Sequence, residues 1–187
     1  GWTQVENGEA VALRRFQSDG LALEATRIVS DDGDSVIARS QSIQLAELTG
    51  GGIVTAWTNG NPSVNNQRAN IYGRSLGVDG EDLPAPLPDA VASNRVVKLN
   101  AVDSGDQINP SVTSLPGGGF ALAYADRSGN DGFKGGIFGG IYDAGLNISE
   151  SCGINTFTGT WEPSPALAAA PNGRFLATWR QDNGNIQ

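Results

Sequence analysis

One sixteen-residue pattern occurs three times in this chain, and it limits the possible folds more than any other feature. The three copies align without a gap and occupy residues 42–57, 109–124 and 164–179. The tenth position of each copy is glycine, at Gly51, Gly118 and Gly173, and the last is aromatic, at Trp57, Tyr124 and Trp179. The copies start 67 and 55 residues apart, which indicates a repeated supersecondary unit rather than a heptad or a short solenoid coil.

Each copy has the pattern of a β-hairpin. Residues 43–48, IQLAEL, alternate between apolar and polar side chains, as in a half-buried strand. The segments TGGG, PGGG and PNG supply turn residues that accept a positive φ. The five-residue runs IVTAW, FALAY and FLATW are too short for a helix and fit a strand that is buried on both faces.

Two more strands are expected in each unit. A third strand is predicted from residues 10, 70 and 136, each ending in a turn closed by a glycine, at Gly20, Gly80 and Gly145. A fourth strand is predicted near residues 28, 97 and 154. Arg14, Arg15 and Arg74 lie on the third strand and are predicted to be solvated charges at a sheet edge.

The chain is therefore predicted to be all-β, built from repeated four-stranded antiparallel units in a β-propeller-like arrangement. A β-sandwich and a stacked-sheet solenoid remain alternatives. The units form one repeat domain over 1–187, with a part-unit at 1–41, units at 42–108 and 109–163, and a part-unit at 164–187. A closed ring of one chain would have about three blades, fewer than the roughly four to eight of known propellers. We therefore expect a fragment of a longer chain, or a chain that another copy completes.

Charge and composition exclude several functions. Twenty acidic against twelve basic residues give a net charge of −8, which argues against nucleic acid or an anionic membrane as a partner. No segment approaches the roughly 18 apolar residues of a membrane helix. Without histidine, catalysis by Ser-His-Asp or Cys-His groups and imidazole zinc sites are excluded within this chain. The single cysteine, Cys152, is predicted to be a semi-buried free thiol, with an intermolecular disulfide as the alternative.

Residues 109–145, NPSVTSLPGGGFALAYADRSGNDGFKGGIFGGIYDAG, resemble the repeat of large secreted bacterial proteins that often accompanies hemolysin-type calcium-binding repeats. The other units match more loosely, and together the matches cover most of the chain. The resemblance implies a propeller-like repeat in an extracellular or cell-surface setting. Such repeats occur in adhesins, surface-layer and matrix proteins, and as appendages of enzymes. The calcium-binding nonapeptide itself is absent, so its site is not transferred to this chain.

Calcium is the candidate cofactor, in the loop DRSGNDG. Asp126, Ser128, Asn130 and Asp131 place oxygen-bearing side chains close together, which suits a hard cation. The alternative is an Asx-rich turn whose side chains satisfy their own backbone. The acidic segments 31–34 and 103–106 occupy equivalent places before a first strand, and we favour the turn interpretation there.

Four aromatic residues are candidates for stacking on sugar rings: Trp57, Tyr124, Trp161 and Trp179. The alternative, which we favour, is that they close the core between sheets. No pair of carboxylates is fixed by a motif, so no catalytic residue is assigned.

The sequence thus predicts a non-enzymatic structural or adhesive repeat module of a secreted or cell-surface bacterial protein, with calcium as a candidate stabiliser. The expected partners are other copies of the chain or the rest of a parent chain, and an extracellular glycan is a further candidate. A glycan-binding propeller and an accessory region of a polysaccharide-degrading enzyme are the alternatives.

Overall fold

The computed structural model describes residues 10–30, 40–60, 68–83, 96–129, 135–155 and 164–180. These residues form antiparallel strands and no helix, so the all-β prediction is confirmed for this part of the chain. Among them there is no helix that could cross a membrane.

The strands form two half-sheets and two full sheets, in each of which neighbours in sequence are neighbours in space. The N-terminal half-sheet contains β1 (Ala12–Leu13) and β2 (Arg27–Ile28). Sheet I contains β3 (Ser40–Glu47), β4 (Ile53–Asn59), β5 (Asn70–Leu76) and β6 (Val97–Lys98). Sheet II contains β7 (Gln107–Ser114), β8 (Phe120–Asp126), β9 (Gly136–Tyr142) and β10 (Ile148–Gly153). The C-terminal half-sheet contains β11 (Ala166–Ala169) and β12 (Phe175–Thr178).

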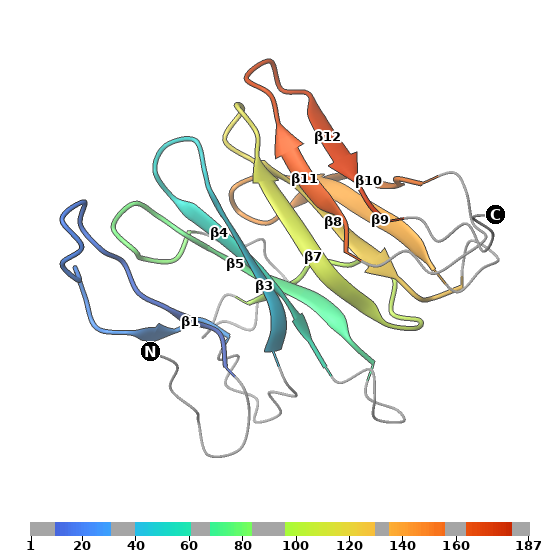
Figure 1. Ribbon diagram of the computed structural model, residues 1–187, viewed down its shortest axis with the longest axis horizontal. Coiled ribbons are helices and arrows are strands. Elements are labelled where there is room, and N and C mark those ends of the chain that lie inside the picture. Colours follow the sequence, from blue (N-terminus) through green and yellow to red (C-terminus); the bar gives the residue numbers. More distant parts are fainter. Residues whose placement is uncertain are drawn as a thin grey trace.

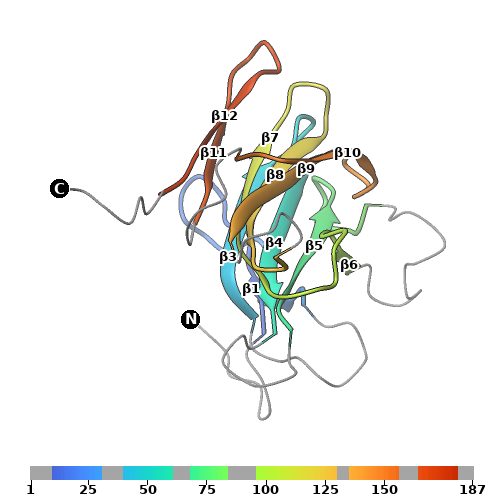
Figure 2. The same cartoon turned by 90° about the vertical axis from the view of Figure 1, so that its right-hand side faces the viewer.

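The sheets lie in a row, with β1 at one end and β11–β12 at the other (Figure 1). In the view at right angles, the axes of β3, β4, β7 and β8 are roughly aligned, with neighbours in each sheet antiparallel (Figure 2). The apolar core is divided between the layers. One cluster, which includes Val54, Ile71, Val112 and Phe120, lies between sheets I and II. A smaller cluster joins the N-terminal half-sheet to sheet I, and another joins the C-terminal half-sheet to sheet II.

Six hairpin turns in the described residues have the same backbone pattern. The N–H of the fourth turn residue donates to the carbonyl of the first, and the N–H of the first donates to the carbonyl of the fifth. The fourth residue has a positive φ, as expected for a type I turn followed by a bulge. The residues at this position are Gly20, Gly51, Gly80, Gly118, Leu146 and Gly173.

The predicted role of Gly145 is wrong by one residue. The turn after β9 starts at Asp143, so its fourth position is Leu146, with a φ of 70°. A leucine in this region is strained. Its side chain is only 4% exposed and packs in the cluster between sheets I and II, which offsets the backbone strain.

The third and fourth strands are joined in the same way in three units. The residue that follows the fourth strand accepts, through its side-chain oxygen, the N–H of the residue at the start of the third. The three pairs are Ser30 with Val11, Asn100 with Ile71, and Asn155 with Ile137. This repetition indicates that β1 and β2 are the third and fourth strands of a unit.

Two further predictions about single residues are wrong. Arg74 is 5% exposed rather than a solvated edge charge. Its guanidinium donates to both carboxylate oxygens of Asp82 and to the carbonyl of Val29, because β5 faces the N-terminal half-sheet and not solvent. Cys152 is exposed, since β10 is the outermost strand of sheet II.

Candidate functional site

The predicted calcium loop begins where β8 ends, and its first carboxylate is already hydrogen-bonded. Asp126 is 4% exposed. Its Oδ1 accepts from Nε2 of Gln107 at 2.8 Å and from the N–H of Ser128 at 3.0 Å. Its Oδ2 accepts from the Ser128 hydroxyl at 2.6 Å. These contacts are those of the alternative Asx turn. Asn130 and Asp131 lie outside the described residues, so the calcium site stays a prediction.

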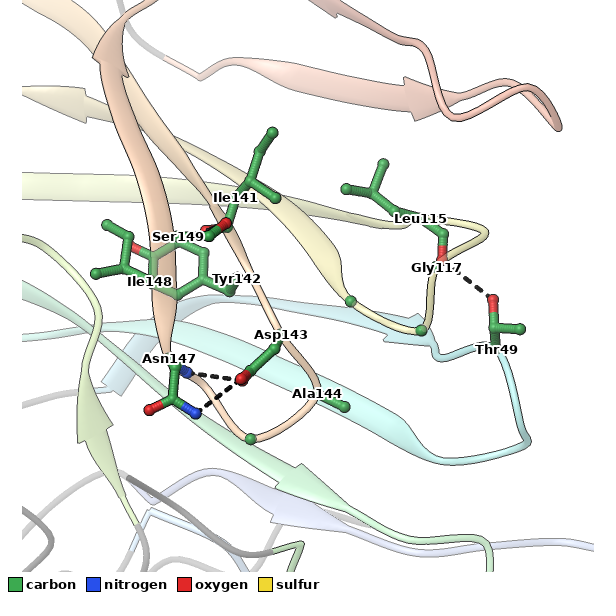
Figure 3. A pocket seen from close by; sticks show the side chains of 13 residues that line it. Thr49, Leu115, Gly117, Ile141, Tyr142, Asp143, Ala144, Asn147, Ile148 and Ser149 are labelled. Carbon is green, nitrogen blue, oxygen red and sulfur yellow. Dashed lines mark hydrogen bonds between the residues drawn. The ribbon is translucent and has the colours of Figure 1, made fainter. Parts of the chain in front are cut away.

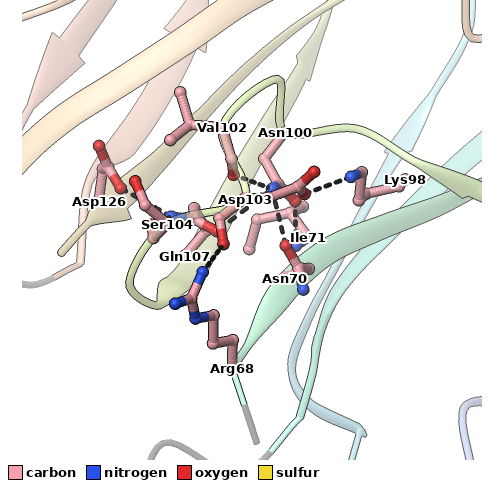
Figure 4. Close-up of polar contacts among 10 residues, drawn as sticks. All are labelled: Arg68, Asn70, Ile71, Lys98, Asn100, Val102, Asp103, Ser104, Gln107 and Asp126. Carbon is pink, nitrogen blue, oxygen red and sulfur yellow. Dashed lines mark hydrogen bonds and ion pairs between the residues drawn. The ribbon is translucent and has the colours of Figure 1, made fainter. Parts of the chain in front are cut away.

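Asp126 belongs to a buried amide network at the junction between sheets I and II (Figure 4). Gln107 is fully buried, and its Nε2 also donates to the Ser104 carbonyl at 2.8 Å. Its Oε1 accepts from Asn100, whose Nδ2 also reaches the Val102 carbonyl at 2.7 Å and Oδ1 of Asn70 at 2.9 Å. An unpaired buried polar group costs about 1–3 kcal/mol, so this network fixes the segment between β6 and β7.

The acidic residues of this segment also have partners. Asp106 Oδ1 accepts from the N–H of Ala69 at 3.0 Å, and its Oδ2 lies 4.0 Å from Nη1 of Arg127. Asp103 forms an ion pair with Lys98. The described residues contain no group of three or more Cys, Asp or Glu side chains arranged to hold a metal ion. The acidic segment 31–34 lies outside them.

The structure places three of the four candidate stacking residues. Trp57 is 1% exposed and Tyr124 is 5% exposed, so neither ring offers a face to a sugar. Both lie in the core between sheets, the alternative that the sequence favoured. Trp179 is half-buried against the cluster that joins sheet II to the C-terminal half-sheet. Trp161 lies outside the described residues.

Two buried tyrosines, Tyr124 and Tyr142, should make the folded state less stable at high pH. Burial, and then the charge of Asp126, raises the pKa of Tyr124 to about 12, and burial raises the pKa of Tyr142 as well. The tyrosines of the unfolded chain have a pKa of about 10, so above that pH the unfolded state releases phenol protons that the folded state still holds. We expect the melting temperature to fall by several degrees as pH rises from about 10 towards 12. Thermal unfolding of the wild type and Tyr124→Phe checks this: the variant should lose less stability over that range, and an equal loss would contradict the assignment.

A shallow hollow lies between the β3–β4, β7–β8 and β9–β10 turns (Figure 3). Across it, the Thr49 hydroxyl donates to the Leu115 carbonyl at 3.1 Å. On its other side, Asp143 accepts from the N–H of Asn147 at 2.9 Å and from Nδ2 of Asn147 at 2.8 Å. These polar groups satisfy one another and hold the turns in place.

A ladder of side chains crosses the sheets at their first strands. Ser42 Oγ donates to Oδ1 of Asn109 at 2.8 Å, and Nδ2 of Asn109 donates to Oγ of Ser164 at 3.3 Å. All three residues have a positive φ, between 53° and 63°. In sheets I and II the register shifts at this point, so a bulge turns the side chain towards the neighbouring sheet.

Comparison with known proteins does not place the chain in a family: no protein-family model matches it, and no match is found among curated proteins. The candidate site therefore depends on the geometry. The most developed feature of that geometry is the contact between successive sheets.

The ladder was not predicted from the sequence. A signal was present, because Ser42, Asn109 and Ser164 are the first residues of the three aligned copies. A polar residue that recurs at one repeat position can bond to its own equivalent in the next unit. Nothing in the pattern indicated that the first strands lie close enough for that bond.

Proposed function

We propose that this chain is a structural module of a secreted or cell-surface bacterial protein, in which propeller-type sheets stack into a rigid support. The single observation that carries the proposal is the ladder of equivalent residues, Ser42–Asn109–Ser164. Sheet I binds sheet II, and sheet II binds the C-terminal half-sheet, through the same repeat position, as expected if the repeat serves stacking. The extracellular setting comes from the resemblance of residues 109–145.

The distribution of contacts supports radial stacking. The most extensive contacts between successive sheets join their first strands, β3 with β7 and β7 with β11. In a sandwich, two sheets would instead contact each other over their whole faces. Sheets that meet at their first strands fan outwards from a common line, as blades do in a propeller.

The interface between sheets I and II has a closely packed apolar core. Val54 and Ile71 of sheet I are fully buried and belong to one cluster with Phe120 and Leu122 of sheet II. Tyr142 of sheet II adds a hydrogen bond of 2.5 Å to the Leu99 carbonyl. Removing one large apolar side chain from such a core costs about 2–5 kcal/mol, so this packing resists separation of the two sheets. A rigid stack would hold the hairpin turns at fixed positions for contact with other molecules.

The ladder gives a direct test of the stack. Asn109→Gly removes both rungs and keeps a residue that accepts a positive φ, while Ser42→Gly removes only the first rung. We expect coupling energies of about 0.5–1.5 kcal/mol in double-mutant cycles of Asn109 with Ser42 and with Ser164, measured by urea unfolding.

The matched control is the cycle of Asn109→Gly with Ser18→Gly, because Ser18 is exposed in the distant β1–β2 turn. That cycle should show no coupling. Equal, near-zero values in all three cycles would mean that the sheets are not joined through the ladder, and the proposal would fail.

A further inference from the structure

The two half-sheets are complementary parts of one unit. In the full sheets the strand order is first, second, third, fourth. β11 and β12 are a first and a second strand, and β1 and β2 are a third and a fourth. Among the described residues, β12 pairs only with β11, and β1 pairs only with β2. The free edge of β12 is where a third strand belongs, and the free edge of β1 is where a second strand belongs.

The side chains of β12 are exposed where their equivalents in the full sheets are covered. Phe175 is 39% exposed, whereas Phe120 at the same repeat position is fully buried. Leu176 is 65% exposed, whereas its equivalents Val54 and Ala121 are fully buried. A third strand and a neighbouring sheet cover these positions in the full sheets.

The N-terminal half-sheet has the matching exposure. Phe16, which directly precedes the turn between β1 and β2, is 57% exposed, whereas the equivalent residues Leu76 and Tyr142 are 1% and 3% exposed. A groove runs beside β1 and is lined by Val11 and Leu13 on one side and Leu45 and Ile53 of sheet I on the other. Leu45 is 60% exposed there, whereas its equivalent Val112 is 8% exposed. The first two strands of a unit would cover this groove.

The two half-sheets lie at opposite ends of the row (Figure 1), so they do not meet within one described chain. We propose that the β11–β12 hairpin of one copy docks in this groove of a second copy, with β12 beside β1. The composite sheet then has the order β11–β12–β1–β2, which is the order of sheets I and II. This inference rests on the proposed function, since it continues the same stacking across two chains.

The full sheets define the register of the new pairing. Phe120 lies opposite Tyr142, and their rings stack with centroids 5.1 Å apart and planes 7° apart. The equivalent residues across the two copies are Phe175 and Phe16, so these rings form the corresponding pair. Arg174 stands where the full sheets have Gly52 and Gly119, and a Cβ at those glycines would lie 2.7 and 2.1 Å from the carbonyl oxygens of Leu76 and Tyr142. β12 and β1 must therefore lie further apart at this end of the pair than β8 and β9 do.

The contact is head-to-tail, because each copy has one hairpin and one groove. Each copy supplies sheet I, sheet II and the two halves of a third sheet. With the described sheets, two copies joined in this way would form a ring of about six blades, within the usual range of about four to eight. The expected assembly is therefore a dimer in which the hairpin of each copy occupies the groove of the other.

Sedimentation equilibrium tests the dimer. The expected mass is twice the 19.4 kDa of one chain. Leu176→Asp should give the mass of one chain, because it places a charge in the groove, and it should still fold, because Leu176 is exposed in the single chain. The control is Ile148→Asp on the outer strand β10, 47% exposed and away from both half-sheets, which should remain dimeric. A wild type of single-chain mass would overturn the inference and point to another occupant of the groove, such as a preceding part of a parent chain.

A cross-link identifies the contact itself. In a Cys152→Ser background, a chain with Phe16→Cys mixed with a chain with Phe175→Cys should form a disulfide-linked dimer under mild oxidation. Ile148→Cys mixed with Phe175→Cys should not. If the protein is a dimer but the Phe16→Cys and Phe175→Cys chains form no disulfide, the docking of the hairpin is wrong. That result would not contradict the proposed stacking of sheets within one chain. Loss of coupling along the Ser42–Asn109–Ser164 ladder would instead remove the proposed function itself.

Discussion

Asp82→Asn is expected to lower the free energy of unfolding by about 3 kcal/mol. Asp82 holds the guanidinium of Arg74 with hydrogen bonds of 2.7 and 2.8 Å, and the Arg74 side chain is only 7% exposed. Removing the carboxylate charge leaves the buried Arg74 cation without its ion-pair partner. The change also weakens the 3.1 Å contact of Asp82 with Arg27 of β2, so the N-terminal half-sheet should loosen from sheet I.

The chain contains a matched control for this prediction. Arg15 and Glu24 form an ion pair of the same two-bond geometry, at 2.7 and 2.9 Å, with side chains 28% and 30% exposed. Glu24→Gln should therefore change stability far less, because solvent screens that pair. Urea unfolding of both variants measures the difference. Equal losses would mean that burial does not set the strength of the Arg74–Asp82 pair.

The burial of Arg74 shows where prediction from the sequence stops. The repeat identified β5 correctly as a third strand, but the nature of its neighbour decides whether a charge on it is solvated. That neighbour is the N-terminal half-sheet, whose Val29 carbonyl accepts from Arg74. The carboxylate partner, Asp82, lies beyond the β5 turn, where the alignment of the repeats no longer gave guidance.

Local features were predicted best. The positions of Gly51, Gly118 and Gly173 fixed three hairpins, because a turn that needs a positive φ leaves a visible mark in the sequence. Leu146 carries no such mark, since its strain is offset by tertiary packing that the sequence does not display. The same limit applies to the candidate site. The favoured core interpretation of Trp57 and Tyr124 followed from their place at strand ends, whereas the contact of Asn109 with two other sheets depends on distances between units.

The three glycines between β7 and β8 should respond very differently to alanine, and Gly119→Ala should have the largest effect. A Cβ at Gly119 would lie 2.1 Å from the carbonyl oxygen of Tyr142 in β9. This oxygen belongs to the backbone, so relief requires β8 and β9 to separate. We expect a loss of about 3 kcal/mol or more, or failure to fold.

Gly118 and Gly117 separate the two possible reasons for the triplet. Gly118 has a φ of 91° and open space around it, so alanine there should cost about 1–2 kcal/mol through backbone strain alone. Gly117 has neither a positive φ nor a neighbour within 4 Å, so alanine should change stability by less than about 0.5 kcal/mol. In urea unfolding, the loss of stability should be largest for Gly119→Ala, intermediate for Gly118→Ala and smallest for Gly117→Ala. If alanine costs more at Gly118 than at Gly119, the glycines are needed chiefly for the backbone conformation of the turn. If the ranking is as predicted, they are needed chiefly because β9 lies so close to Gly119.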